Sequence, residues 1–143
     1  KRFVWNVDNQ CPRRSRLALN FTSWTYNSGT KRQWNGSTAN QVAFVCGLAG
    51  AAATFTLTQC AVTGSSGWVV NGLGHNTTTA YSGDATMVIL NTQGASTSSA
   101  TTITPTLGYN YVAGIERTDG VYTGTNNGGG GNAQNGIHGT LMM

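Results

Sequence analysis

The sequence predicts an all-β fold, a β-sandwich resembling a jelly roll. Three observations lead to this prediction: apolar and polar residues alternate in many short runs, stretches rich in Gly, Ser and Asn separate the runs, and no segment has the periodicity of an amphipathic helix. Roughly eight to ten short strands with such spacing are typical of sandwiches and jelly rolls. The chain has no internal repeat and no domain boundary, so we expect one β-sandwich domain over residues 1–143.

The first two runs place apolar side chains on one face, and the second places arginines on the other. Because side chains alternate across a sheet, the arginines within residues 14–21 are predicted to lie on the outer, solvated face of a half-buried strand. The apolar faces are Phe3, Trp5 and Val7 in the first run and Leu17, Leu19 and Phe21 in the second, whose outer face carries Arg14, Arg16, Ala18 and Asn20.

Later runs repeat this alternation, with one exception. In residues 85–91 both faces are apolar, which predicts a strand buried on both sides, inside a sandwich or against another subunit. The other apolar faces are Val42, Phe44 and Cys46, then Phe55 and Leu57 between threonines, then Leu107, Tyr109, Tyr111 and Ile115, and last Ile137, Leu141 and Met143. The predicted loops are residues 26–40, 63–67, 91–99 and 124–136.

The composition indicates an uncharged polar surface. Only 8% of the residues are charged, against about 25% in an ordinary soluble domain, so Ser, Thr, Asn and Gly must cover much of the exterior. The net charge is +4, but the basic residues are spread over several strands, which is typical of a solvated face, and we expect no nucleic-acid partner. We also expect no membrane insertion, because no apolar span is visible. The chain begins at Lys1 without Met, which favours a processed product or part of a longer protein.

Cysteines and histidines show no metal-binding spacing. Cys11, Cys46 and Cys60 are odd in number and form no CxxC pair, so we expect buried thiols in a protein that folds in a reducing cytoplasm, with one bridge from Cys11 left open. His75 and His138 have no partner in a recognised pattern, and we expect no metal and no cofactor.

The acidic residues give little support for catalysis. Glu116 and Asp119 are close enough in sequence to serve as an acid and base pair of the kind used in glycoside hydrolysis. With Arg117 between them, a salt bridge beside a turn is the simpler interpretation. We therefore expect no catalytic residues and no enzymatic activity.

Self-association is predicted by the apolar C-terminal strand, the doubly apolar run 85–91 and the low charge. The alternative is a monomer whose own core uses all of these side chains. The candidate subunit-interface residues are Met87, Ile89, Tyr109, Tyr111, Leu141 and Met143.

Glycan binding is the more plausible kind of recognition, since aromatic faces and amide side chains hold sugars. Trp5, Trp24 and Trp68 are interpreted as core rings, whereas Trp34 lies beside a polar loop and is expected to be exposed. The candidate receptor- or glycan-contact residues are Trp34, Asn126, Asn127, Asn132 and Gln134.

Several segments together resemble a domain common at the C-terminal ends of bacteriophage virion proteins. They are "KRFVWNVDNQCPRRSRLAL", "SWTYNSGTKRQWNGSTANQVAFVCGLAG", "TPTLGYNYVAGIER" and the closing "GIHGTLMM". The similarity spans nearly the whole chain. It departs at "GLGHNTTTAYSG", where those domains tend to have an Asp-Ser-Thr element, and near "GIERTDG", where they tend to have an acidic and aromatic pair.

The resemblance implies the tip of a fibre or spike: an all-β, homotrimeric, non-enzymatic module on the virion surface, assembled in the host cytoplasm. Its expected partners are its own copies, other virion proteins and a glycan or protein of the host surface. Two alternatives remain open, a capsid or tail decoration module without a receptor and a secreted lectin-like domain.

Overall fold

The computed structural model describes residues 12–18, 23–48, 51–63, 67–90, 95–127 and 135–142. Within these ranges the protein is all-β: it contains no α-helix, and a single 3₁₀ turn covers Trp34–Gly36. The strands are β1 (Pro12–Ala18), β2 (Trp24–Tyr26), β3 (Arg32–Gln33), β4 (Gln41–Cys46), β5 (Ala53–Thr63), β6 (Gly67–His75), β7 (Ala85–Leu90), β8 (Ala95–Ile103), β9 (Gly108–Thr118), β10 (Gly124–Asn127) and β11 (Gly136–Met142).

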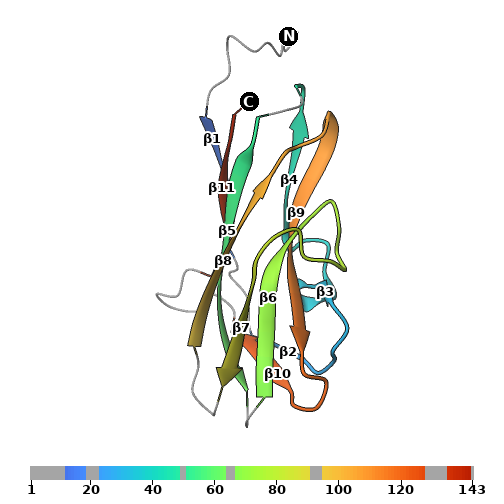
Figure 1. The fold of residues 1–143 in the computed structure, drawn as a ribbon, viewed down its shortest axis with the longest axis vertical. Helices are drawn as coiled ribbons and strands as arrows, with labels where there is room; N and C mark the ends of the chain where they lie inside the picture. Colours follow the sequence, from blue (N-terminus) through green and yellow to red (C-terminus); the bar gives the residue numbers. More distant parts are fainter. Residues whose placement is uncertain are drawn as a thin grey trace.

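These strands form two antiparallel sheets, each organised around one eleven-residue strand. In the first sheet β5 pairs along one edge with β8 and along the other with β11 and β10, placed end to end. In the second sheet β9 pairs with β6 on one edge and with β4 and β3 on the other. Figure 1 shows the two sheets running along the length of the molecule, an arrangement consistent with a β-sandwich.

The strand pairs are nested in sequence. The innermost pair is β6 with β7, and the successive outer pairs are β5 with β8, β4 with β9, β2 with β10 and β1 with β11. The first three of these pairs alternate between the two sheets. This connectivity brings the first and last described strands side by side, so β1 and β11 together form one end of the first sheet.

The core lies between the sheets and contains side chains from both. Phe44 of β4 stacks on Phe55 of β5 with ring centroids 5.9 Å apart, and this contact joins the two layers. Burial of a ring such as Phe55, which is fully buried, contributes roughly 2–3 kcal/mol. The predicted inner faces of β4 and β5 are confirmed, because Val42, Phe44, Cys46, Phe55 and Leu57 are all at most 7% exposed.

The strand buried on both faces is β6, not the predicted run 85–91. The loop after β6 folds back over the outer face of the second sheet and lays Tyr81 against Gly72, where a Cβ would come within 2.7 Å of the ring. In β7, by contrast, Met87 and Ile89 are 54% and 71% exposed, and the residues that turn inward are Val88 and Thr86, whose hydroxyl donates to the Ser98 carbonyl of β8. The prediction was wrong within the single chain because β7 is an edge strand whose outward Met87 and Ile89 are left exposed.

Three predicted loops contain strands. Residues 32–33 form the short β3 beside β9, residues 95–99 begin β8, and residues 124–127 form β10. Gly, Ser and Asn rarely signal a strand, but the last two segments lie beside the long β5, which supplies a ladder of backbone partners. Tertiary pairing therefore overrides composition here.

The C-terminal strand faces the core as predicted, but its residues do not all keep the proposed interface role. Ile137 and Leu141 are buried in the core, and Leu17 packs against it. Leu141, only 1% exposed, is wrong as a candidate subunit-interface residue, since its own chain already covers it. Several predicted positions lie outside the described residues, namely Phe3, Trp5, Val7, Cys11, Leu19, Phe21 and Met143. No helix in the described part of the chain has the length and apolar character needed to cross a membrane.

Candidate functional site

The outer face of the first sheet carries basic and hydroxyl side chains in register. Alternation along β1, β11 and β5 turns every second side chain outward, and the antiparallel pairing aligns them into rows across the three strands. The two rows are Arg14–Thr140–Thr54 and Arg16–His138–Thr56. The predicted outward position of the arginines is confirmed, because both are exposed.

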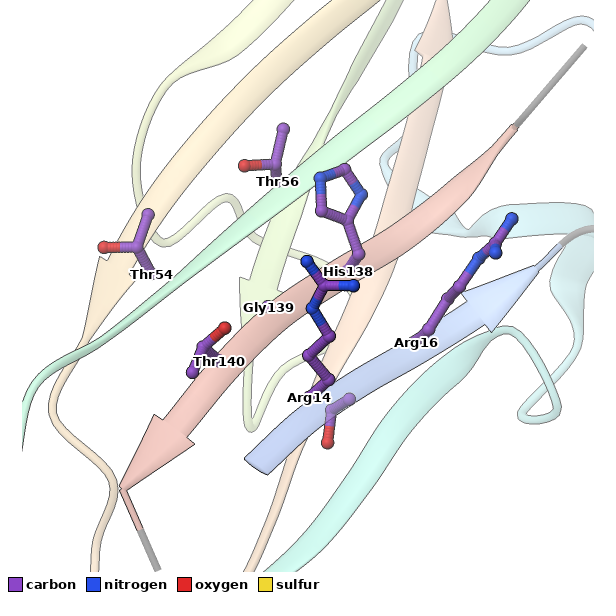
Figure 2. A pocket seen from close by; sticks show the side chains of 8 residues that line it. Arg14, Arg16, Thr54, Thr56, His138, Gly139 and Thr140 are labelled. Atoms are coloured by element: carbon purple, nitrogen blue, oxygen red, sulfur yellow. The ribbon is translucent and has the colours of Figure 1, made fainter. Parts of the chain in front are cut away.

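These rows line a shallow groove of about 610 Å³. Figure 2 shows Arg14 and Arg16 rising from β1 on the same side of the sheet as His138, Thr54 and Thr56. A second hollow of about 180 Å³ shares Arg16 and His138 with the groove and continues toward Gly136 and Asn135. Gly136 has no side chain, so nothing rises from β11 at that position to close the hollow. We call the two spaces together the basic groove.

The basic groove is suited to an anion that also carries hydroxyl groups. None of its lining residues is acidic. Neither Arg14 nor Arg16 forms an ion pair with a described residue; the ion pair found among the described residues joins Arg32 and Glu116. A guanidinium presents several N–H donors in a fixed planar fork that matches a carboxylate or phosphate. Threonine hydroxyls both donate and accept hydrogen bonds.

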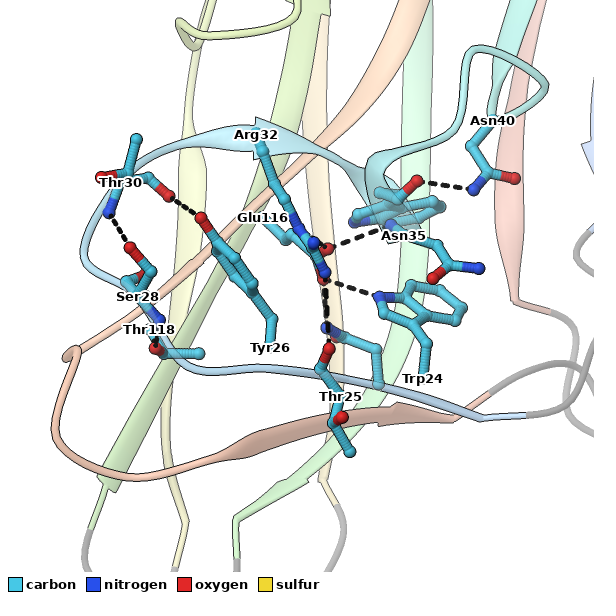
Figure 3. Close-up of polar contacts among 12 residues, drawn as sticks. Trp24, Thr25, Tyr26, Ser28, Thr30, Arg32, Asn35, Asn40, Glu116 and Thr118 are labelled. Atoms are coloured by element: carbon cyan, nitrogen blue, oxygen red, sulfur yellow. Dashed lines mark hydrogen bonds and ion pairs between the residues drawn. The ribbon is translucent and has the colours of Figure 1, made fainter.

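A second polar site is buried and centres on Glu116. This carboxylate is fully buried and accepts on Oε1 from Arg32 Nε at 2.9 Å and from the Asn35 backbone N–H at 3.0 Å. On Oε2 it accepts from Trp24 Nε1 at 2.7 Å and from Asn126 Nδ2 at 2.6 Å. Figure 3 shows the indole and guanidinium converging on it.

The local sequence explains how the chain reaches this carboxylate. Asn35 and Gly36 have φ of 54° and 58°, in the left-handed region that Asn and Gly adopt most easily. This turn aims the Asn35 N–H at Glu116 and folds Trp34 inward. The Arg32 guanidinium is held over the Tyr26 ring, 3.7 Å from its centroid.

The hydrogen bonds around Glu116 run in one direction. Trp34 Nε1 donates to Asn71 Oδ1, Asn71 Nδ2 donates to Asn126 Oδ1, and Asn126 donates to the carboxylate. Burial raises the pKa of the Glu116 carboxyl above its usual value, and the hydrogen bonds from Trp24, Arg32 and Asn35 together with the Arg32 charge oppose that rise. Since every neighbour is a donor, the arrangement fixes amide orientations in the core and offers no open position to a ligand.

Two predicted glycan contacts belong to this buried cluster and are therefore wrong. Trp34 is 0% exposed: its ring lies on Gly114, where a Cβ would come within 2.4 Å of it, and its indole N–H binds Asn71. Asn126 is also 0% exposed. The position of Trp34 beside a polar loop suggested exposure, but the absence of a side chain at Gly114 provides the space in which the ring is buried.

The remaining predicted contacts divide into one structural residue and two that cannot be placed. Asn127 is half-buried, and its backbone carbonyl accepts hydrogen bonds from Gln59 and Asn135. Asn132 and Gln134 lie outside the described residues.

The predicted salt bridge of Arg117 with Glu116 or Asp119 is wrong, because Glu116 pairs with Arg32 instead. Adjacent strand residues face opposite sides, so Arg117 points outward and lies over Trp68, 5.1 Å from its ring centroid, while Glu116 points inward. Asp119 binds the backbone N–H groups of Val121 and Tyr122 in the turn after β9. The two acids thus occupy different surroundings and form no acid and base pair.

Cysteines and histidines in the described part of the chain form no cluster with acids that could hold a metal ion. Cys46 is buried and free, and burial raises the pKa of its thiol; Cys60 is half-buried and free. His75 binds Asn110 through Nε2. His138 is exposed and belongs to the basic groove.

Sequence reasoning missed the basic groove as a site. Arg14 and Arg16, the threonines of β5, and His138 with Thr140 each alternate visibly in the sequence. The sequence does not show that β1 pairs with β11 and β11 with β5, and it is this pairing that aligns the arginines, His138 and the threonines.

The fold and the site define an all-β protein with a basic, hydroxyl-rich groove on an exposed sheet face. In comparisons with known proteins, no family model matches the chain and no curated protein is detectably similar to it.

Proposed function

We propose that the chain is the attachment head of a bacteriophage fibre or spike, a non-enzymatic module that holds the virion on the host surface. The observation that carries the proposal is the basic groove, an exposed recognition surface whose lining contains no acidic side chain. The sequence resemblance to C-terminal domains of phage virion proteins supports the same function.

The fold proposed for this head is a jelly roll. Nested antiparallel pairs that alternate between two sheets are the connectivity of that fold, and the order β1–β11–β5–β8 in one sheet with β4–β9–β6–β7 in the other agrees with it. Jelly rolls recur in viral capsid and lectin domains. The fold is compatible with attachment, but the site carries the argument for it.

The head is proposed to be a homotrimer that uses the outer face of the second sheet. Val45, Met87, Ile89 and Tyr109 are between 54% and 71% exposed on that face, and Val45 and Tyr109 are register partners on β4 and β9. The rings of Tyr109 and Tyr111 lie 6.2 Å apart beside them. Exposed apolar side chains over several strands are typical of an association surface.

Cytoplasmic assembly onto a virion fits the cysteines better than secretion does. The thiols of Cys46 and Cys60 are free, and Cys46 is buried. Disulfide frameworks are typical of small secreted domains. Two free thiols therefore do not favour the alternative of a secreted lectin-like domain.

An adsorption assay tests the proposed function. Purified protein is expected to bind host cells and to reduce phage adsorption in proportion to the fraction of host-surface sites that it occupies. Heat-denatured protein is the control. The three copies in the proposed homotrimer would reinforce one another through effective concentration. Protein that is folded and trimeric but neither binds cells nor competes with phage would favour a capsid or tail decoration module.

A further inference from the structure

We propose that the basic groove binds an acidic saccharide, a chain of sugars carrying carboxylate or phosphate groups. This inference deepens the proposed function and rests on it for the source of the saccharide. The site itself is argued from the groove alone.

The first step is the spacing of the positive charges. Arg14 and Arg16 are two residues apart on β1 and point to the same side, so their Cα atoms are separated by about 7 Å. His138 lies beside Arg16 in the next strand. Two exposed guanidinium groups at this spacing can share one anionic group or hold anionic groups on neighbouring sugars.

The second step is the hydroxyl ladder next to the arginines. Thr54, Thr56 and Thr140 line the groove beyond the charges. Thr54 Oγ1 lies 3.1 Å from Thr102 Oγ1 on the adjacent strand, so the ladder continues across β8. Hydroxyl groups that both donate and accept match the ring hydroxyls of a sugar. The cations select an anion, and the threonines favour an anion that carries hydroxyl groups.

The third step is the size and composition of the space. A groove of about 610 Å³ with an adjoining hollow of about 180 Å³ is too large for a single small ion and falls in the range of organic ligand sites. No Trp, Tyr or Phe lines it. Single-stranded nucleic acid needs aromatic stacking platforms, and a neutral sugar would find no aromatic face here. An acidic saccharide uses every feature that the groove offers.

The experiment measures binding by titration calorimetry at low ionic strength. The probes are tetragalacturonate for carboxylates, a short poly(glycerol phosphate) for phosphates, and maltotetraose as the neutral control. Arg14→Gln and Arg16→Gln each remove one charge from the groove. Arg13→Gln removes one charge from the same strand on the side facing away from it, because Arg13 alternates with Arg14 and Arg16 and does not line the groove.

Wild type and Arg13→Gln are expected to bind at least one acidic probe equally well. Each groove variant should bind it about tenfold more weakly, the loss associated with one charged hydrogen bond. Whichever acidic probe binds identifies the anionic group. Maltotetraose should not bind. All three arginines are exposed, so equal melting temperatures are expected and would exclude misfolding.

Two results would overturn the inference: an Arg13→Gln loss equal to that of the groove variants, which indicates general charge attraction, or no binding of either acidic probe. Host-cell adsorption separates this inference from the proposed function. If wild type adsorbs and the groove variants adsorb equally, attachment stands and the groove assignment fails. If the acidic probe binds through the groove but the protein does not adsorb, the groove assignment stands and the attachment function fails.

Discussion

The indole Nε1 of Trp24 donates a 2.7 Å hydrogen bond to Oε2 of Glu116, linking β2 in one sheet to β9 in the other. Trp24 is 7% exposed and Glu116 is fully buried. The same oxygen also accepts from Asn126, whose amide is oriented by Asn71. One carboxylate thereby fixes the direction of a chain of hydrogen bonds that crosses the core.

Replacing this carboxylate by an amide should destabilise the protein although the shape is retained. In Glu116→Gln the new NH2 group faces donors on whichever side it lies, so at least one buried donor loses its acceptor. We expect the free energy of unfolding to fall by about 2–4 kcal/mol. Urea denaturation followed by tryptophan fluorescence measures it. Asp84→Asn makes the same chemical change at an exposed position and should stay within about 0.5 kcal/mol of wild type; equal effects would contradict the role given to Glu116.

A methyl group at Gly114 should disrupt the packing of Trp34. The added Cβ would lie 2.4 Å from the indole ring, and a buried ring fixed by Asn71 cannot move aside freely. Overpacking of this kind costs about 1–3 kcal/mol, so Gly114→Ala should lower the melting temperature by several degrees, as scanning calorimetry would detect. Gly29→Ala is the matched control, because its nearest neighbour is 3.9 Å away. A fully stable Gly114→Ala protein would show that Trp34 has other space available.

Asp119 should make stability depend on pH at the acidic end. Hydrogen bonds from the Tyr122 and Val121 backbone N–H groups hold the pKa of the Asp119 carboxyl below its usual value. A lowered folded-state pKa means that its stabilising contribution is complete above the unfolded-state pKa and is lost as pH falls through the folded-state pKa. The stability difference between wild type and Asp119→Asn should therefore shrink between about pH 5 and about pH 2.

Urea titrations of the two proteins over this range test the prediction. Subtracting the free energies of unfolding of the two proteins at each pH cancels the contribution of Glu116. The raised pKa of Glu116 makes stability change with pH in the opposite direction, and it does so equally in both proteins. A difference that stays constant or grows on acidification would contradict the assigned role of Asp119.

A charge on the outer face of the second sheet should prevent self-association. Ile89 is 71% exposed in the single chain and would be desolvated in the proposed trimer. Burying an unpaired carboxylate there is unfavourable, so Ile89→Asp should be monomeric at concentrations where wild type is trimeric by light scattering. Ser96→Asp adds the same charge on the outer face of the other sheet and should remain trimeric. If wild type itself is a monomer at micromolar concentration, the trimer proposal fails.

The strand pattern was predictable where a side chain's neighbours in sequence determine its environment. Val42, Phe44 and Cys46 alternate with exposed residues, and they lie inward as expected. Arg14 and Arg16 are exposed and lie outward, whereas Ser15 and Leu17 between and after them are half-buried. By contrast, the loop prediction for residues 95–99 failed because three of these five residues are Ser, a weak strand signal, and the ladder with β5 makes the segment a strand.

The sequence by itself determined the fold class and the inward faces of β4 and β5, because alternation is a local property of an extended chain. Only the tertiary structure decided which residues meet. Arg32 pairs with Glu116 across 84 positions, and Arg16 reaches the same groove as Thr56 through an intervening strand. Such contacts depend on register and on sheet order, which are set by many weak pairings acting together, and no short segment of the sequence encodes them.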